Sequence, residues 1–240
     1  MIEIRLLSGH VEYAEAVNLQ RAIWGFADLE LIPVRVFVAT VNVGGMALGA
    51  FDGGRMMGFL LAIPGMKHKS GWPPEPYLHS HMLGVLEEYR NHGVGRLLKL
   101  EQRKIALNRG LKLIEWTFDP FEAKNAYFNI ERLGAIVRRH IPDMYGKTSS
   151  PLHAGMPTDR CVAEWWIASD RVQQTIDGKR PITEPVLQVP VGRKSVAAQL
   201  ELGARFRKAD DAQLAATGFE RTAEGGNYLM TRVENHASLR

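Results

Sequence analysis

The chain has 240 residues, 45% of them hydrophobic and 23% charged, which predicts a globular protein with ample length for a core. The formal net charge is +4, but the basic residues are spread along the chain rather than gathered in a stripe, so we expect no nucleic-acid partner. Residues 1–8 do not resemble a signal peptide, no stretch approaches the roughly 20 apolar residues of a membrane span, and the single cysteine, Cys161, excludes an intramolecular disulfide, so we expect a cytoplasmic protein with no membrane partner.

The N-terminal segment predicts a strand followed by a helix. Residues 2–7 alternate apolar and charged side chains, as a half-buried strand does. Ala16, Leu19 and Ile23 then fall on one helical face, and Gly25 is suited to end that helix. The N-terminal part of the chain is therefore expected to contain one strand and one helix.

Residues 34–43 are β-branched enough to suit either a helix or a strand. Residues 46–52 and 55–63 predict two strands joined at Asp52-Gly53-Gly54, a strong hairpin signal. Residues 64–76 contain four prolines and two glycines, which predicts a loop.

Residues 77–86 predict a strand and residues 94–109 a helix that Gly110 ends. The expected apolar face of this helix contains Val94, Leu97, Leu98 and Ile105, and its expected polar positions include Lys99, Arg103 and Lys104. A strand over 111–118 follows, and then a helix over 121–133 that Asp119 is placed to cap. The remaining expected elements are an extended segment over 135–140, a loop over 146–159, strands over 162–168 and 186–191, a helix over 195–216 and a hairpin over 219–233. This order predicts a mixed α/β layer with helices packed on a sheet.

The most informative segment joins the strand at 77–86 to the helix at 94–109. It contains the pattern Arg-x-x-Gly-x-Gly at Arg90, Gly93 and Gly95. A turn there directs main-chain N–H groups toward one point, and the helix N-terminus adds the positive end of its dipole. Glycines at 93 and 95 let the backbone approach a bulky pyrophosphate, and Arg90 and Arg96 add charge. The pattern therefore predicts a phosphate-binding loop.

Other phosphate loops and metal sites fit less well. The position three residues after Gly95 is Leu98, so the Gly-x-Gly-x-x-Gly dinucleotide pattern is absent, as is the Gly-Lys-[Ser/Thr] of a P-loop. No His, Asp or Glu set has the spacing of a metal-ligand motif such as His-Glu-x-x-His. The loop alone is also compatible with a simple tight turn.

The strand, the Arg-x-x-Gly-x-Gly loop and the helix resemble the acyl-CoA-binding motif of the GNAT superfamily of N-acetyltransferases. The resemblance covers residues 2–140 in element order, with 76–134 as its specific part. Stretches such as Trp116-Thr117-Phe118-Asp119-Pro120 and Glu164-Trp165-Trp166 resemble a bacterial subgroup with an extended C-terminal part, in which some members are N-succinyltransferases acting on amino acids. The resemblance implies an α/β fold with a mixed, mostly antiparallel central sheet flanked by helices and a C-terminal extension.

The resemblance also implies the cofactor and the activity. The cofactor is acetyl-CoA or another acyl-CoA, and the activity is transfer of an acetyl or similar acyl group, such as succinyl, to the amine of a small molecule. The implied cofactor-binding residues are Leu83, Gly84, Val85, Arg90, Asn91, His92, Gly93, Val94, Gly95, Arg96, Asn125 and Phe128.

At the expected catalytic positions, this chain departs from the pattern of the family. Some members place a glutamate base where this chain has His79, and His81 shares its strand face by parity. Many members place a tyrosine acid four residues before the glycine that ends the second helix, and here that position is Ile130. The alternative acids are Tyr145 and water. Arg138 and Arg139 are candidates to clamp a substrate carboxylate.

The expected domains are residues 1–170, which bind acyl-CoA and catalyse, and residues 181–235, a strand–helix–hairpin extension packed on them. The interpretations open for the extension are an added domain, a lid and a homodimer contact. The alternative function is a non-catalytic module that binds or senses acyl-CoA.

Overall fold

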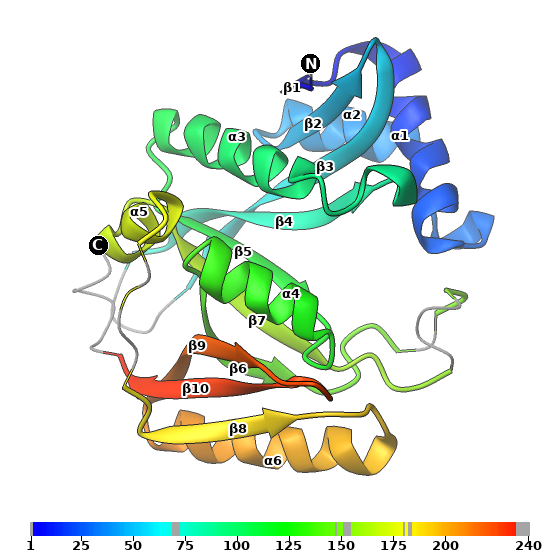
Figure 1. The fold of residues 1–240 in the computed structure, drawn as a ribbon. Helices are drawn as coiled ribbons and strands as arrows, with labels where there is room; N and C mark the ends of the chain where they lie inside the picture. The colour runs from blue at the N-terminus through cyan, green and yellow to red at the C-terminus, as the bar shows by residue number, and fades with distance from the viewer. Residues whose placement is uncertain are drawn as a thin grey trace. The chain divides into compact units, whose positions relative to one another are not determined.

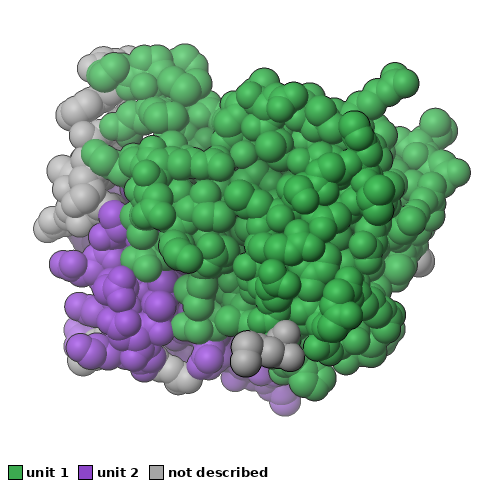
Figure 2. Space-filling model, turned by 90° about the horizontal axis from the view of Figure 1, so that it is seen from above, with its two compact units in different colours: residues 1–114, 148–154 green, residues 115–147, 155–240 purple. Residues whose placement is uncertain are grey.

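The computed structural model describes residues 2–68, 73–146, 148–150, 155–179, 181 and 184–233. The chain divides into two compact units, which Figure 2 colours separately: unit 1 contains residues 1–114 and 148–154, and unit 2 contains residues 115–147 and 155–240. The sequence predicted a different division, into a catalytic domain over residues 1–170 and an extension over 181–235. That division by function stays a prediction.

Unit 1 is built on an antiparallel sheet with the strand order β1-β2-β3-β4 (Figure 1). Helices α1 and α2 pack on one face of this sheet, and α3 packs on the other. The elements in chain order are β1 (Glu3–Leu6), α1 (Gly9–Trp24), η1 (Asp28–Glu30), α2 (Val34–Asn42), β2 (Met46–Asp52), β3 (Arg55–Lys67), β4 (Glu75–Val85), η2 (Glu87–Tyr89) and α3 (Val94–Asn108).

The core of unit 1 decides the state of the ambiguous segment 34–43, which is the helix α2. Phe37 of α2 is fully buried and stacks on Tyr13 of α1, with ring centroids 5.8 Å apart. Both rings belong to a cluster that includes Phe59 and Leu61 of β3. A strand at this position would not present the same apolar face to α1, so tertiary packing outweighs the β-branched composition.

The loop expected over residues 64–76 is wrong for most of that segment. Strand β3 continues to Lys67 and β4 begins at Glu75, and the two pair with Pro64 opposite Leu78 and Pro76 opposite Met66. Strand β2 pairs with β3 only as far as Ala62. Beyond that point no strand among the described residues pairs with this edge of β3, and a proline without an N–H is tolerated on such an edge. Residues 69–72 of the expected loop lie outside the described residues.

Unit 2 has the strand order β5-β7-β6-β9-β10-β8. The pairs β6–β7, β6–β9, β9–β10 and β8–β10 are antiparallel, and helix α6 packs against β6, β8 and β9. The elements in chain order are β5 (Leu113–Phe118), α4 (Ala123–Tyr127), the π-helical η3 (Phe128–Arg132), β6 (Ile136–Ile141), β7 (Arg160–Trp166), α5 (Asp170–Ile176), β8 (Leu187–Val191), α6 (Val196–Asp211), β9 (Leu214–Arg221) and β10 (Gly226–Arg232). Mostly antiparallel strands flanked by helices confirm the expected fold class.

Two details of unit 2 differ from the sequence expectation. The helix expected over 195–216 ends at Asp211, because Gln213 adopts a left-handed φ of 56° and the chain from Leu214 onward pairs with β10. Helix α5 was not expected, although Ser169 caps it by accepting a hydrogen bond from the Val172 N–H.

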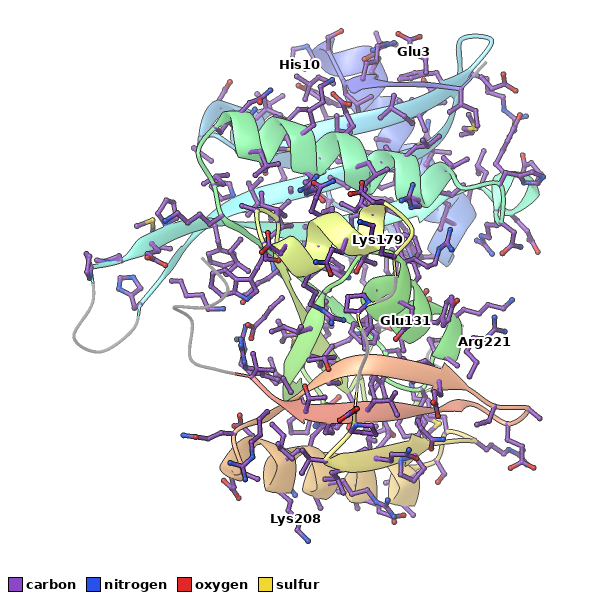
Figure 3. All side chains as sticks on the ribbon, turned by 60° about the vertical axis from the view of Figure 1, so that its left-hand side comes forward. Glu3, His10, Glu131, Lys179, Lys208 and Arg221 are labelled. Carbon is purple, nitrogen blue, oxygen red and sulfur yellow. The ribbon has the colours of Figure 1, made fainter. Side chains whose placement is uncertain are left out.

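The outer side of α6 is solvated, and Figure 3 shows Lys208 pointing away from the strands.

Over the described residues, no helix combines the length and the apolar content that crossing a bilayer requires. Cys161 is buried in β7, as a small core residue should be, and its burial raises the pKa of the thiol.

Candidate active site

The loop between β4 and α3 has the backbone conformation that a phosphate site needs. Asn91 and Gly93 both have left-handed φ angles, 65° and 80°, so the chain reverses sharply before α3 begins. Gly93 is the N-cap of α3, and the Leu97 N–H donates to its carbonyl at 3.0 Å. The N–H groups of Val94 and Gly95 therefore precede the first hydrogen bond of the helix and point out of its N-terminus. These free amides form the positive end of the helix dipole, and His92 and Gly93 lie next to it.

The two arginines of the loop have different settings. The Arg90 guanidinium donates from Nε to the Val85 carbonyl at 3.2 Å, which ties the loop back to the end of β4. Arg96 lies in the first turn of α3 and is half-buried. The bond to Val85 uses Nε of Arg90 and leaves its two terminal nitrogens out. The contacts of Arg90 and Arg96 with a pyrophosphate stay predictions.

Strand β4 leads into the loop through Leu83, Gly84 and Val85, which pair with β3. Gly84 faces α1 at close range. A Cβ built on Gly84 would lie 2.7 Å from Trp24 Cη2 and 2.8 Å from Ile23 Cδ1. An added side chain would therefore have to displace the indole of Trp24 and the end of the Ile23 side chain, both of which α1 holds against the strand.

Replacing Gly84 by alanine should therefore destabilise the protein by about 1–3 kcal/mol, the usual cost of overpacking a core. Gly95→Ala is the matched control, since its Cβ would meet only Leu83 Cδ2, at an ordinary 3.5 Å. That control should keep or slightly raise stability, because alanine favours a helix over glycine. Urea unfolding of both variants measures the difference, and equal midpoints would show that α1 yields freely.

His79 and His81 lie on β4 with their ring centroids 5.7 Å apart. The register of β4 against β3 shifts between Ser80 and Met82, which leaves His81 as the extra residue of a β-bulge. The side chain of Ser80, between them, bonds to α3 on the opposite face. Both histidines therefore point to the same side of β4, as parity predicts. The His81 side chain reaches the surface, but its partial desolvation lowers its pKa below the ordinary value.

A buried polar cluster beneath β4 was not expected from the sequence. Lys99 is 3% exposed, and its Nζ donates to Ser80 Oγ at 2.9 Å and to Gln102 Oε1 at 3.3 Å. The assignment of Lys99 to a polar face of α3 is therefore wrong, and Leu97, expected to be inside, is 38% exposed. Burial lowers the pKa of Lys99 well below its usual value. Helical periodicity gave no signal for this reversal, because a lysine is ordinarily a surface residue.

The candidate residues on the second helix belong to unit 2. Asn125 is exposed on α4, and Phe128 is half-buried at the first position of the π-helical turn η3. Such turns occur often at functional sites. Ile130 is fully buried, so the position expected to hold a tyrosine is a core residue here. The cofactor contacts of Asn125 and Phe128 stay predictions.

Tyr145 lies in the turn after β6 and reaches β5. Its hydroxyl is 2.8 Å from Thr117 Oγ1 in a hydrogen bond, and 42% of the residue is exposed. The Tyr145 N–H donates to Thr158 Oγ1 at 2.9 Å, which fixes the turn. The phenol is thus tied to the strand that precedes α4 while it stays partly exposed.

Arg138 and Arg139, the candidates for a clamp on a substrate carboxylate, are both already paired with glutamates of the protein. Arg138 pairs with Glu164, and Arg139 donates to Glu115 Oε1 at 2.8 Å. Both glutamates are almost fully buried on β7 and β5. The two guanidinium groups therefore balance internal charges that sequence spacing alone could not pair with them.

Comparisons with known proteins place this geometry in a family. The model of the acetyltransferase (GNAT) family matches residues 13–134. A search of curated protein sequences finds no significant match. The family match covers β4, its loop and α3, together with the second helix, so the region with the specific resemblance is the region that matches.

Three solved structures illustrate the shared fold. The ribosomal-protein-S18-alanine N-acetyltransferase from Escherichia coli is 14% identical, with 70% of this chain and 94% of that chain covered and a TM-score of 0.52. Arabidopsis thaliana NAA60 in complex with acetyl-CoA is 17% identical, with 70% and 99% covered and a TM-score of 0.57. Aminoglycoside 6'-acetyltransferase type Ii is 20% identical, with 69% and 97% covered and a TM-score of 0.51. Almost all of each structure is matched, whereas about 30% of this chain lies outside the match.

Proposed function

Because the chain belongs to the acetyltransferase (GNAT) family, we propose that it transfers an acetyl or similar acyl group, such as succinyl, from coenzyme A to the amine of a small molecule such as an amino acid. The family assignment makes it an N-acyltransferase that uses acetyl-CoA or another acyl-CoA. The acyl group and the class of acceptor are the parts that we propose. The acceptor class rests on the subgroup resemblance of the sequence.

The observation that carries the proposal is the pair of left-handed residues, Asn91 and Gly93, at the N-terminus of α3. This conformation supports a pyrophosphate held by main-chain amides of residues 92–96. Leu83 and Val85 on β4 offer their main chain to the pantetheine arm. The thioester would then lie along β4, near the two histidines.

The reaction needs a base, an oxyanion site and a protonated leaving group. The acceptor amine loses a proton to a neutral imidazole, His79 or His81, and its nitrogen attacks the thioester carbon. A main-chain N–H near Leu83 or Gly84 stabilises the oxyanion. The carbon–sulfur bond then breaks, and the coenzyme A thiolate takes up a proton. Since Ile130 cannot supply that proton, Tyr145 is the proposed donor.

The test is an assay of thiol release from acetyl-CoA and succinyl-CoA with a panel of amines: amino acids, an aminoglycoside, polyamines and short peptides with a free N-terminus. The background from the protein is small, because its one cysteine, Cys161, is buried. We expect release that depends on a small amine, with mass spectrometry detecting the N-acyl product. Binding of acyl-CoA without release for any amine would favour the non-catalytic module, and a preference for peptides would favour a protein acceptor.

A further inference from the structure

Unit 2 contains a cavity of about 190 Å³ that shares no residue with the acyl-CoA loop. It opens between the end of β6, residues 157–159 and helix α6. Its apolar walls are Pro142, Pro157, Val196 and Leu200. Its volume is below the roughly 300–1,000 Å³ of pockets for drug-sized ligands, so it suits a smaller molecule.

The residues that line this cavity include a buried pair, His140 and Asp159. The side chains are 3% and 5% exposed, and His140 Nε2 lies 3.0 Å from Asp159 Oδ2. The nitrogen is nevertheless without a well-aligned hydrogen bond to any described residue. Asp159 is fixed by the Asp143 N–H, which donates to its Oδ1 at 3.1 Å, and the imidazole is fixed by stacking on Phe206. A buried imidazole–carboxylate pair, held in place from both sides, therefore lines the cavity.

Gln199 supplies a second unsatisfied group. It is 3% exposed, and its Nε2 donates to the Pro157 carbonyl at 2.8 Å, which sets the orientation of the amide. Its Oε1 is buried and has no hydrogen-bond partner among the described residues. A buried acceptor left without a donor is costly, so this oxygen is suited to receive an N–H from a ligand.

Arg207 supplies positive charge beside the same cavity. Its Nη1 lies 3.5 Å from the point where a Cβ on Gly203 would be, and His140 Cε1 lies 3.1 Å from that point. Gly203 thus lets the guanidinium and the imidazole approach each other. Within the part of the chain that the structure describes, Arg207 has no carboxylate partner, whereas its neighbour on α6, Arg205, pairs with Glu201 at 2.6 Å.

From these groups we infer that the cavity is a binding site for a free aliphatic α-amino acid. The carboxylate pairs with Arg207, the ammonium group donates to Gln199 Oε1 beside the acidic Asp159, and the side chain packs on Pro142, Val196 and Leu200. The two signs of charge and the apolar wall match the three parts of a zwitterionic amino acid. This site does not depend on the proposed transferase function.

Calorimetric titration of the full chain with L-leucine, without coenzyme A, tests the site. We expect saturable binding with a Kd of about 1 mM or tighter, as a small ligand allows. Isocaproate lacks the ammonium group, isoamylamine lacks the carboxylate and glycine lacks the side chain, so each should bind at least about 10-fold more weakly. No heat with L-leucine up to about 10 mM, or equal binding of isocaproate, would overturn the assignment.

Two variants locate the binding. Arg207→Gln should weaken L-leucine binding about 10-fold or more, because a charge-assisted hydrogen bond is lost. Arg205→Gln is the matched control on the same helix, and it should change the Kd less than about twofold, since Arg205 does not line the cavity. Arg207 is exposed and Arg205 is half-buried, so neither change should unfold the protein. Equal effects of the two variants would contradict the site.

Discussion

Replacing Gly93 by glutamate is expected to weaken coenzyme A binding at least about 100-fold, equivalent to about 2.7 kcal/mol. The new carboxylate would stand at the N-terminus of α3, where the pyrophosphate is proposed to bind. Two like charges about 4 Å apart repel by about 4 kcal/mol at an effective dielectric constant near 20, which exceeds the expected loss. Isothermal titration with coenzyme A measures the effect.

The control for this variant lies at the other end of the same helix. Gly110 has a φ of 74° against 80° for Gly93, and a Cβ at either position meets nothing within 4 Å. Gly110→Glu therefore introduces the same charge with the same backbone strain of about 1–2 kcal/mol, but away from the loop. Its affinity for coenzyme A should match that of the parent. A folded Gly93→Glu protein that binds coenzyme A normally would remove the basis of the proposed site.

The second large effect is expected on catalysis. His79→Ala should lower kcat about 10²- to 10⁴-fold, the range for loss of a general base, while KM for acyl-CoA changes little. His81→Ala should have this effect instead if the residue at the bulge is the base. His10→Ala, exposed on α1 (Figure 3), is the control and should leave kcat unchanged. Steady-state kinetics of the three variants assigns the role, and normal kcat in both β4 variants would contradict a histidine base.

The pH profile separates the two histidines further. A base must be neutral to accept a proton, and partial desolvation lowers the pKa of His81 below its ordinary value of 6.5. If His81 is the base, kcat/KM should stay constant as pH falls from 8 to about 6.5 and decline only below that value. Loss of this acidic limb in His81→Ala would assign it, and an unchanged limb would exclude His81.

Local patterns predicted much of the fold and the centre of the candidate site. The hairpin at Asp52-Gly53-Gly54, the strand β4 and the helix α3 follow from alternation, helical periodicity and turn residues. The Arg-x-x-Gly-x-Gly pattern predicted a turn between a strand and a helix, and Gly93 in that turn has a left-handed φ. The cap expected at Asp119 is wrong: Asp119 accepts a hydrogen bond from the Phe121 N–H at 2.9 Å within a local turn, whereas α4 begins at Ala123 with Glu122 as its N-cap. These features depend on residues only a few positions apart.

Other features depend on residues far apart in the chain, and local patterns could not reveal them. The burial of Lys99 depends on Ser80, 19 residues away, and the pairing of Arg139 depends on Glu115, 24 residues away. The bulge at His81 comes from the register of β4 against β3. The cavity at His140 requires residues of β6, the segment 157–159 and α6 together.

The sequence by itself therefore determined the class of the fold, most of its elements and the place of the phosphate loop, because backbone propensity and side-chain periodicity act over one or two turns. Only the tertiary structure decided which polar side chains are buried, which charges are already paired and which strand residue is bulged. The reason is that burial and pairing are set by non-local contacts, whose energies outweigh the local preference of any single residue.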